Sequence, residues 1–493
     1  MTLRRQATRG VFWVGVSTTI NGFFLQLNRL ILARMLLPGD FGLVAMANLS
    51  LDFLARFREM GFSSALIYHK GDMRKAADTT FIMLLVIAAL LTVISFAFAP
   101  VVALFFRTAE LTNVLRALSV TFILSALGEV HLSLLAKNMS FRERLLPDLV
   151  PTAVNGIIAV LLALMGFGAW SLVIAKIVDT ALTSMLAWVV VPWWRPRLRF
   201  DRQEARGLFD YGKHIIGSSV LIYFITNLDS TFVGRVLGEA QLAFYNFAYN
   251  QANLPATQIS RVVGQVLFPA YSLIQENIET LRSAFFKSLR YVCLLSIPLS
   301  VGMIAFAAPF MYTLYGARWA PAIVPLQVLG LYGLLRSVAV NMGSVFKAGG
   351  KPNWLTYIAL GRLAVMGIFL YPATRYYGII GVSVLSAVVS IVDLVVSAAL
   401  TNLIIHGKLA DYVSALWVPS VFSVLSAVVA TRVYGLISAA HGFIGLVMAG
   451  ILMVFLYLTA VLVFDREVRA LLLGWLSAAE GVGQRWISGE PQE

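Results

Sequence analysis

Charged residues are scarce in this chain of 493 residues. They make up only 13% of the sequence, whereas 59% of the residues are hydrophobic. A soluble protein of ordinary composition would carry roughly 25% charged residues. The mean hydropathy, +0.83, is correspondingly high. The composition therefore excludes an ordinary water-soluble protein and predicts a polytopic membrane protein.

Cysteine is almost absent as well. Cys293 is the single cysteine, which excludes an intrachain disulfide and a CxxC metal site. The sequence also contains no GxxxxGK[ST] phosphate loop, no HExxH metal motif and no GxSxG nucleophile elbow. We therefore expect neither ATP hydrolysis nor another enzyme activity, and no bound cofactor.

Long apolar runs, bounded by charges, proline and glycine, dominate the chain. A membrane-spanning helix needs about 20 such residues, and the runs predict an all-α protein with about 14 transmembrane helices. We expect these helices over residues 11–33, 41–67, 78–105, 112–136, 147–166, 168–191, 208–233, 242–269, 285–308, 322–347, 354–374, 378–401, 412–436 and 443–464.

The positive charges indicate how the helices are oriented. The first ten residues, MTLRRQATRG, are basic, and the apolar run behind them lacks a small-residue cleavage site, so we expect a retained first helix. If the amino terminus is cytoplasmic, lysine and arginine are more than three times as frequent in the inside loops as outside. This bias predicts that both termini are cytoplasmic.

The two halves of the chain resemble each other. Residues 28–47, NRLILARMLLPGDFGLVAMA, align with residues 229–248, DSTFVGRVLGEAQLAFYNFA. A repeated unit of six helices keeps its orientation, so the copies are expected to be related by a pseudo-two-fold axis along the membrane normal, as in some transporters. We predict an N-lobe (1–200), a C-lobe (201–405), and a last segment (406–493) with two further helices and a cytoplasmic tail.

The eighth expected helix carries the strongest polar stripe. On an ideal helix its polar residues fall within an arc of about 80°; they are Asn246, Asn250, Asn253, Thr257 and Arg261. Asparagine and threonine also join neighbouring helices by hydrogen bonds. Because an arginine is rarely needed for that purpose, we favour a stripe that lines a cavity.

The second expected helix carries a charged stripe. Asn48, Asp52, Arg56 and Glu59 share an arc of about 80°, and Arg56 can pair with either acid. Two carboxylates around one arginine would make either a proton-titratable cluster for ion coupling or a neutral network that fixes helix packing. The sequence leaves both interpretations open.

Other buried polar residues are candidates for the same cavity. Asn28 and Arg29 extend the polar face of the first helix, and Arg336 and Arg362 lie in the tenth and eleventh. These two arginines either line the cavity or reach towards a membrane interface. Asp393 lies on a serine stripe of the twelfth helix, where it either carries a proton or accepts serine hydrogen bonds.

Two pairs of residues receive structural interpretations. Lys176 and Asp179 are spaced i,i+3 and are expected to form an ion pair. Glu129 and His131 point to opposite faces of one helix, so they are not expected to form a joint site.

The substrate is expected to be an anion. A cavity with several arginines suits phosphate, because guanidinium binds phosphate oxygens through two hydrogen bonds and stays charged at any relevant pH. Nearby Asn, Thr, Tyr and Trp side chains can bind or stack against sugar rings. A cavity for cationic drugs would instead present acids without basic partners.

Five stretches carry a family resemblance: LARMLLPGDFGL (32–43), the similar triplets FAP (98–100) and AAP (307–309), VLFPAYSLIQ (266–275) and SLRYVCLLSIPLSVGM (288–303). With them, the first 405 residues resemble bacterial polysaccharide flippases of the multidrug/oligosaccharidyl-lipid/polysaccharide exporter superfamily. The resemblance implies alternating-access transport of an undecaprenyl-diphosphate-linked oligosaccharide to the periplasmic leaflet of the inner membrane. The product would feed O-antigen, capsule or exopolysaccharide assembly.

The resemblance also implies site residues and partners. Related lipid II flippases hold the diphosphate with arginines of helices 1, 2 and 8, which match Arg29, Arg56 and Arg261 here. Residues 412–464 would form the groove for the lipid tail. A polysaccharide polymerase and a chain-length regulator are implied partners, no nucleic acid is expected, and protons, sodium or the membrane potential would drive transport.

Two other functions remain as alternatives. A proton- or sodium-coupled drug antiporter on the same fold would use carboxylates such as Asp52, Glu59 and Asp393 for coupling. A polysaccharide polymerase or ligase would need a long periplasmic loop, and every outside loop predicted here is short.

Overall fold

The computed structural model describes residues 3–59, 61–69, 71–465 and 469. Within these ranges, the side chains of residues 3–12, 59, 211–216, 218, 258–266 and 438–441 lie outside the description. The described residues form helices and connecting turns, without a strand among them, which confirms the all-α prediction.

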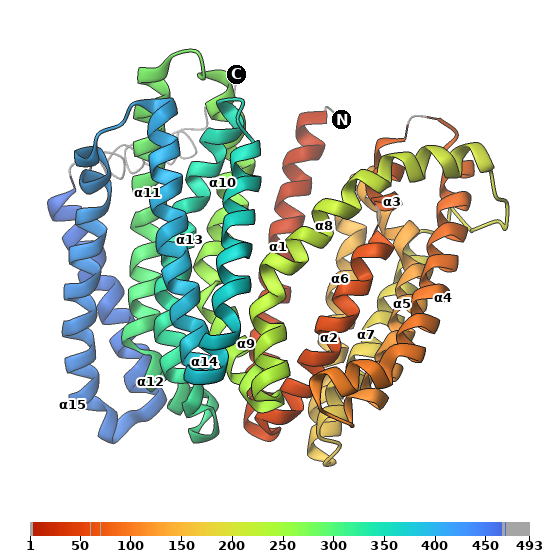
Figure 1. Cartoon of the computed structure of the whole chain (residues 1–493), viewed down its shortest axis with the longest axis horizontal. Helices are drawn as coiled ribbons and strands as arrows, with labels where there is room; N and C mark the ends of the chain where they lie inside the picture. The colour runs from red at the N-terminus through yellow and green to blue at the C-terminus, as the bar shows by residue number, and fades with distance from the viewer. Residues whose placement is uncertain (1–2, 60, 70, 466–468, 470–493) are drawn as a thin grey trace, which may run out of the picture. The chain divides into compact units, whose positions relative to one another are not determined.

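The helices follow one another with short connections (Figure 1). In chain order they are α1 (Leu3–Met35), α2 (Pro38–Glu59), α3 (Phe62–Tyr68), α4 (Met73–Phe106), α5 (Leu111–Lys137), α6 (Phe141–Leu164), α7 (Ala169–Val190), α8 (Arg202–Leu237), α9 (Glu239–Ala252), α10 (Leu254–Leu273), α11 (Ile278–Ala305), α12 (Ala307–Phe310), the π-helix η1 (Met311–Tyr315), the 3-10 helix η2 (Ala317–Ala322), α13 (Ile323–Ala348), α14 (Asn353–Ile405) and α15 (Leu409–Phe464).

The chain forms two compact units. The first unit contains Met1–Asn246 and Gly367–Val382, and the second contains Phe247–Met366 and Ser383–Glu493. The division therefore falls within α9 and α14. In the first unit α4 packs on α5, α6 on α7 and α1 on α6; in the second, α11 packs on both α13 and α15. The predicted lobe boundaries at residues 200 and 405 stay predictions.

Many helices are built to face lipid. Among the described residues, ten helical segments are long and apolar enough to cross a membrane. Large apolar side chains such as Val93, Ile368 and Leu458 stand exposed along them, as expected where the surrounding medium is hydrocarbon rather than water. These observations support a multi-pass membrane protein, and the total of 14 spans stays a prediction.

Two of the expected helices are interrupted. The helix expected over residues 41–67 ends at Glu59 and restarts as α3 after Gly61, which adopts a left-handed conformation with φ 66°. The helix expected over 242–269 is likewise divided into α9 and α10 at Asn253. The segments expected over 354–374 and 378–401 both lie in α14, and they meet at a kink where Gly378 has the non-helical angles φ 60° and ψ −149°, as expected for two helices.

The break after the first helix is a tightly packed turn. An Asp40 carboxylate oxygen accepts a hydrogen bond from the Leu37 backbone N–H at 2.9 Å, which satisfies this donor at the start of α2. A Cβ atom built on Gly42 would lie 1.8 Å from the backbone oxygen of Glu239. Only glycine therefore allows α2 and the start of α9 to approach this closely.

Glu239 itself lies in an acidic environment. Its side chain is half-buried, and burial raises the pKa of this carboxyl above the usual 4.5, with further contributions from the charges of Glu110 and Asp40. The raised pKa follows because both burial and neighbouring negative charge disfavour the ionised form.

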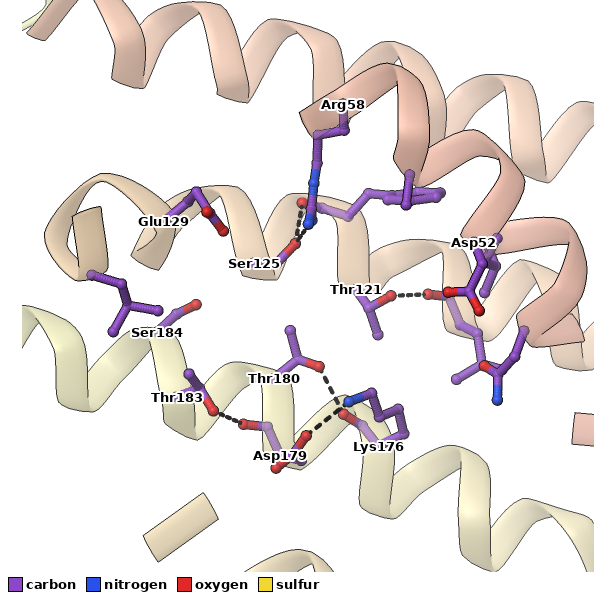
Figure 2. A pocket seen from close by; sticks show the side chains of 16 residues that line it. Asp52, Arg58, Thr121, Ser125, Glu129, Lys176, Asp179, Thr180, Thr183 and Ser184 are labelled. Atoms are coloured by element: carbon purple, nitrogen blue, oxygen red, sulfur yellow. Dashed lines mark hydrogen bonds and ion pairs between the residues drawn. The ribbon is translucent and has the colours of Figure 1, made fainter. Parts of the chain in front are cut away.

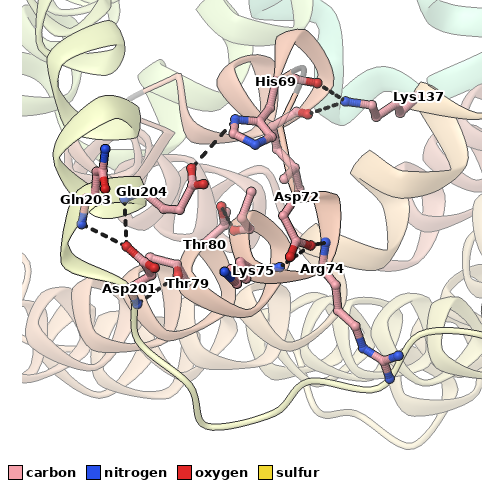
Figure 3. Close-up of polar contacts among 12 residues, drawn as sticks. His69, Asp72, Arg74, Lys75, Thr79, Thr80, Lys137, Asp201, Gln203 and Glu204 are labelled. Atoms are coloured by element: carbon pink, nitrogen blue, oxygen red, sulfur yellow. Dashed lines mark hydrogen bonds and ion pairs between the residues drawn. The ribbon is translucent and has the colours of Figure 1, made fainter.

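The long connection before α8 is anchored to the first unit at Asp201 (Figure 3). The Asp201 backbone N–H donates to the Thr79 hydroxyl at 3.1 Å, and its carboxylate accepts from the backbone N–H groups of Gln203 and Glu204. A carboxylate oxygen of Glu204 (Oε2) in turn lies 3.7 Å from Nδ1 of His69. Asp201 thus starts α8 as its N-cap and fixes the helix to α4.

Candidate functional site

The first unit contains a polar pocket between three helices, which we call the first-unit pocket (Figure 2). Its volume is about 330 Å³. Helix α2 contributes Asp52 and Arg58, and α5 contributes Thr121, Ser125 and Glu129. The α5 residues recur every four positions, so the helical repeat places all three on one face.

Helix α7 completes the pocket with Lys176, Asp179, Thr180 and Thr183. Their i, i+3, i+4, i+7 spacing is that of a single helical face. Lys176 Nζ lies 3.0 Å from an Asp179 carboxylate oxygen, which confirms the predicted ion pair. The threonine hydroxyls donate to backbone oxygens one turn earlier, Thr180 to Lys176 at 2.9 Å and Thr183 to Asp179 at 2.8 Å.

Two further contacts orient the charged side chains on the other walls. Arg58 Nη1 donates a short hydrogen bond to the Ser125 hydroxyl, and a Glu129 carboxylate oxygen accepts from the Ser63 hydroxyl at 2.9 Å. His131, two residues further on, packs between the rings of Trp188 and Trp194 instead. Glu129 and His131 therefore lie in different environments, as predicted.

The second unit contains a cluster of two arginines around a tyrosine hydroxyl. This arginine–tyrosine cluster consists of Tyr249, Asn253, Tyr332, Arg336 and Arg362. Arg362 Nη2 donates to the Tyr332 hydroxyl at 3.0 Å, and Arg336 Nη1 lies 3.4 Å from the same oxygen and 3.3 Å from the Asn253 side-chain oxygen. The Tyr249 and Tyr332 hydroxyls are 3.3 Å apart.

The fold explains why these residues meet. Tyr332 and Arg336 are one turn apart on α13, while α9 supplies Tyr249 and α14 supplies Arg362. Tyr332 is fully buried, whereas both guanidinium side chains are partly exposed. In the contacts given above each arginine uses a single nitrogen, and a guanidinium has five N–H donors in all. The remaining donors suit an oxyanion with several acceptor oxygens.

Asp393 is an acid that interacts with this cluster. It interacts electrostatically with Arg362, although the two residues lie in different parts of α14. The sequence offered serine partners or proton transfer for Asp393, and the structure adds this arginine as its electrostatic partner.

The remaining predicted site residues lie outside the arginine–tyrosine cluster or outside the described residues. Arg29 and Asn250 are exposed. Asn28 packs against Gly156 of α6, so closely that a Cβ atom built on this glycine would lie 3.0 Å from the Asn28 amide nitrogen. Arg56 and Asp52 both lie within electrostatic range of Tyr223 on α8. The side chains of Arg261 and Glu59 lie outside the described residues.

The polar stripe expected on the eighth helix crosses the junction between α9 and α10. Asn246 accepts a hydrogen bond from the Ser230 hydroxyl at 2.8 Å in the first unit, whereas Asn253 faces Arg336 in the second. The backbone of Asn253 stays in the right-handed helical region, and its N–H donates to the Tyr249 oxygen at 3.0 Å. The side chain of Arg261 lies outside the described residues, so the stripe as a cavity lining stays a prediction.

Sequence reasoning missed Arg58 and Tyr332. The predicted face of the second helix was centred between Asn48 and Arg56, but the pocket face is rotated by about 60° from it and includes Arg58. A tyrosine is not conspicuous in an apolar helix. Its position four residues before Arg336 was the available signal.

Comparison with known proteins places this architecture in a family. Residues 31–324 match the polysaccharide biosynthesis protein family. The chain belongs to this family. Within it, the chain is 30% identical over 373 residues to the succinoglycan biosynthesis transport protein ExoT of Rhizobium meliloti (strain 1021), covering 75% of each chain.

Solved structures show which fold this family member has. The lipid II flippase MurJ, in its inward closed conformation, is 15% identical and superposes with a TM-score of 0.72, covering 93% of this chain and 99% of MurJ. An inward-facing multidrug resistance MATE transporter of the MOP superfamily is 16% identical, with a TM-score of 0.63 over 80% of this chain and 98% of the transporter. The chain therefore has the MOP transporter fold.

Proposed function

We propose that the chain is a flippase that moves a lipid-linked oligosaccharide from the cytoplasmic to the periplasmic leaflet of a bacterial inner membrane. Its family, the transport role named for ExoT and the flippase named for MurJ support this proposal. The two units would alternate access to the substrate, and the product would feed O-antigen, capsule or exopolysaccharide synthesis. The chain would act as a transporter rather than as an enzyme.

The arginine–tyrosine cluster is the observation that carries the proposal. An undecaprenyl diphosphate carrier has charged oxygens that must be held inside the membrane, where an unpaired charge is costly. Arg336 and Arg362 present planar donors that match such oxygens, and their partial exposure lets a ligand reach them. Asp393 would balance part of their charge when no substrate is bound.

Several details belong to the same proposal. The excess of lysine and arginine in the predicted inside loops favours cytoplasmic termini. Asp52, Glu59 and Asp393 are the candidates for coupling to protons or sodium, and a polymerase and a chain-length regulator would receive the product. Arg29, Arg56 and Arg261 stay candidates for diphosphate binding.

A deletion strain tests the proposed function directly. Without the chain, the lipid-linked oligosaccharide should accumulate in the cytoplasmic leaflet and surface polysaccharide should disappear. Expression of the wild-type chain should restore export, and Arg336→Gln should not, although the variant protein reaches the membrane. Arg318→Gln is the matched control, because Arg318 is an exposed arginine of the same unit. Normal export by Arg336→Gln would contradict the assignment of this cluster.

A coupled drug antiporter is the second candidate, favoured by the MATE-like fold. It predicts that the deletion strain becomes sensitive to cationic drugs while its surface polysaccharide stays normal. The family match and the transport role named for ExoT favour the flippase over this candidate.

A further inference from the structure

The first-unit pocket gathers polar groups on helices that are otherwise apolar. Glu129 lies in α5 and Lys176 and Asp179 lie in α7, and both helices are long and apolar enough to cross a membrane. Ionisable groups inside such segments usually face a water-filled cavity or a ligand. The pocket of about 330 Å³ provides this cavity, and its volume is within the range of about 300–1,000 Å³ found for small-molecule sites.

The charges in the pocket disfavour a phosphate group. Three carboxylates line it, from Asp52, Glu129 and Asp179, against two cationic groups, from Arg58 and Lys176. Lys176 already pairs with Asp179. The first-unit pocket therefore lacks the positive excess of the arginine–tyrosine cluster, and an anion would be repelled. Among the described residues, no group of three or more acidic, histidine or cysteine side chains is arranged to hold a metal ion.

The hydroxyl groups of the pocket act as acceptors. The Thr121, Thr180 and Thr183 hydroxyls each donate their proton to a backbone oxygen of their own helix. Their oxygen lone pairs remain for a ligand. Donors come mainly from Lys176 and Arg58. Such a pocket suits a ligand that is rich in O–H donors and also offers acceptors to the two cations, which is the chemistry of a sugar.

We propose that the first-unit pocket binds a sugar residue of the transported oligosaccharide, while the arginine–tyrosine cluster binds the diphosphate. This inference rests on the proposed flippase function and adds a glycan-recognition site to it. Asp179, held by Lys176, and Thr183, one turn further along α7, are the residues assigned to sugar hydroxyls. The pocket would thus contribute to the selection of the glycan, and the cluster would recognise the lipid carrier common to all substrates.

Binding of two lipids that differ only in the glycan tests this proposal. The first probe is the lipid-linked oligosaccharide extracted from cells that lack the chain, and the second is undecaprenyl diphosphate without sugar. Dissociation constants are measured for the full chain in nanodiscs. The wild type should bind the glycan-bearing lipid more tightly than the bare lipid. Asp179→Asn should remove about tenfold of this preference or more, because a lost hydrogen bond to a charged group has roughly this effect. Thr183→Val should remove about threefold, because it removes one neutral hydrogen bond.

Binding of the bare lipid shows whether a variant is folded. The dissociation constant for this lipid should stay within about twofold of the wild-type value, which is a smaller change than the loss of one ordinary hydrogen bond would cause. Asp148→Asn is the matched control: Asp148 is an acid of the same unit that pairs with Arg144 at 3.4 Å and does not line the pocket. Wild-type affinity of both pocket variants for the glycan-bearing lipid would overturn the inference and leave the flippase proposal standing. A wild type that binds neither lipid would overturn both. If Asp179→Asn instead removes only the dependence of transport on a pH gradient, the pocket serves ion coupling and the inference is wrong.

Discussion

Arg362 donates a hydrogen bond of 3.0 Å to the hydroxyl of Tyr332, and its guanidinium carbon also lies 5.6 Å from the centre of that ring. The two side chains come from different helices, α14 and α13. Because the contact uses one edge of the guanidinium, the tyrosine holds the arginine in place while other N–H donors remain for a ligand. Tyr332 is therefore a positioning residue, and Arg362 is the group that would contact phosphate.

These two roles predict different effects on lipid binding. Arg362→Gln should weaken binding of undecaprenyl diphosphate by about tenfold or more, because it removes a charge-assisted contact. Tyr332→Phe should weaken binding by only about threefold, because it removes one neutral hydrogen bond and keeps the ring. Binding assays in nanodiscs check both values, with Arg318→Gln as the control. Equal losses in the two variants would mean that Tyr332 contacts the ligand itself.

Gly42 should not tolerate a side chain. Gly42→Ala places a Cβ atom 1.8 Å from the Glu239 backbone oxygen, so α2 and α9 must move apart. We expect a loss of about 1–3 kcal/mol in the free energy of unfolding. Gly22→Ala is the control, because no other atom lies within 4 Å of its Cβ, and alanine there should be neutral or stabilising by up to about 1 kcal/mol. Thermal unfolding in detergent measures both, and an unchanged melting temperature for Gly42→Ala would refute the close approach.

A buried ion pair joins α11 to the residue after α15. Arg290 Nη2 lies 2.7 Å from Asp465, whose side chain is 0% exposed. Asp465→Asn leaves the arginine charge without its carboxylate, so we expect a loss of about 3 kcal/mol in the free energy of unfolding. The double variant Arg290→Met/Asp465→Asn should recover part of this loss, because no unpaired charge remains.

The partly exposed pair Arg144–Asp148 provides the comparison for this ion pair. Asp148→Asn should cost less than about 1 kcal/mol, since solvent screens a pair on one helix surface. Thermal melts of the three variants side by side check the ranking. A loss for Asp465→Asn no larger than for Asp148→Asn would show that the buried pair contributes little.

Glu239 should make stability depend on pH. Burial and the neighbouring acids raise the pKa of this carboxyl in the folded protein. The contribution of its protonated form to folding stability is therefore fully present below 4.5, the pKa in the unfolded chain. It is lost as the pH rises through the folded pKa. Glu239→Gln should therefore be more stable than wild type at neutral pH and should lose less stability as the pH rises from 4.5.

Melting temperatures across this pH range test the prediction. The exposed residue Glu279 provides the control variant, Glu279→Gln, which should follow the wild-type pH curve. If Glu239→Gln also follows that curve, the pKa of Glu239 does not limit stability.

The sequence alone was sufficient for much of the architecture. Its composition identified a membrane protein, its apolar runs located the helices, and its short stretches indicated the family that the comparison confirmed. Helical periodicity also predicted the contact between Lys176 and Asp179, because both residues belong to one helix and their separation follows from its geometry.

Contacts between helices needed the tertiary structure. Periodicity says which residues share a face, but not which helix packs against that face or how far the face is rotated. This is why Arg58 was missed, and why the contact between Asn253 and Arg336 on α13 was not predicted. The sequence by itself determined that the protein is a membrane protein and that several arginines lie within its apolar helices. Only the packing of α9, α13 and α14 decided that Arg336 and Arg362 converge on Tyr332, because helices distant in sequence are brought together by long-range packing.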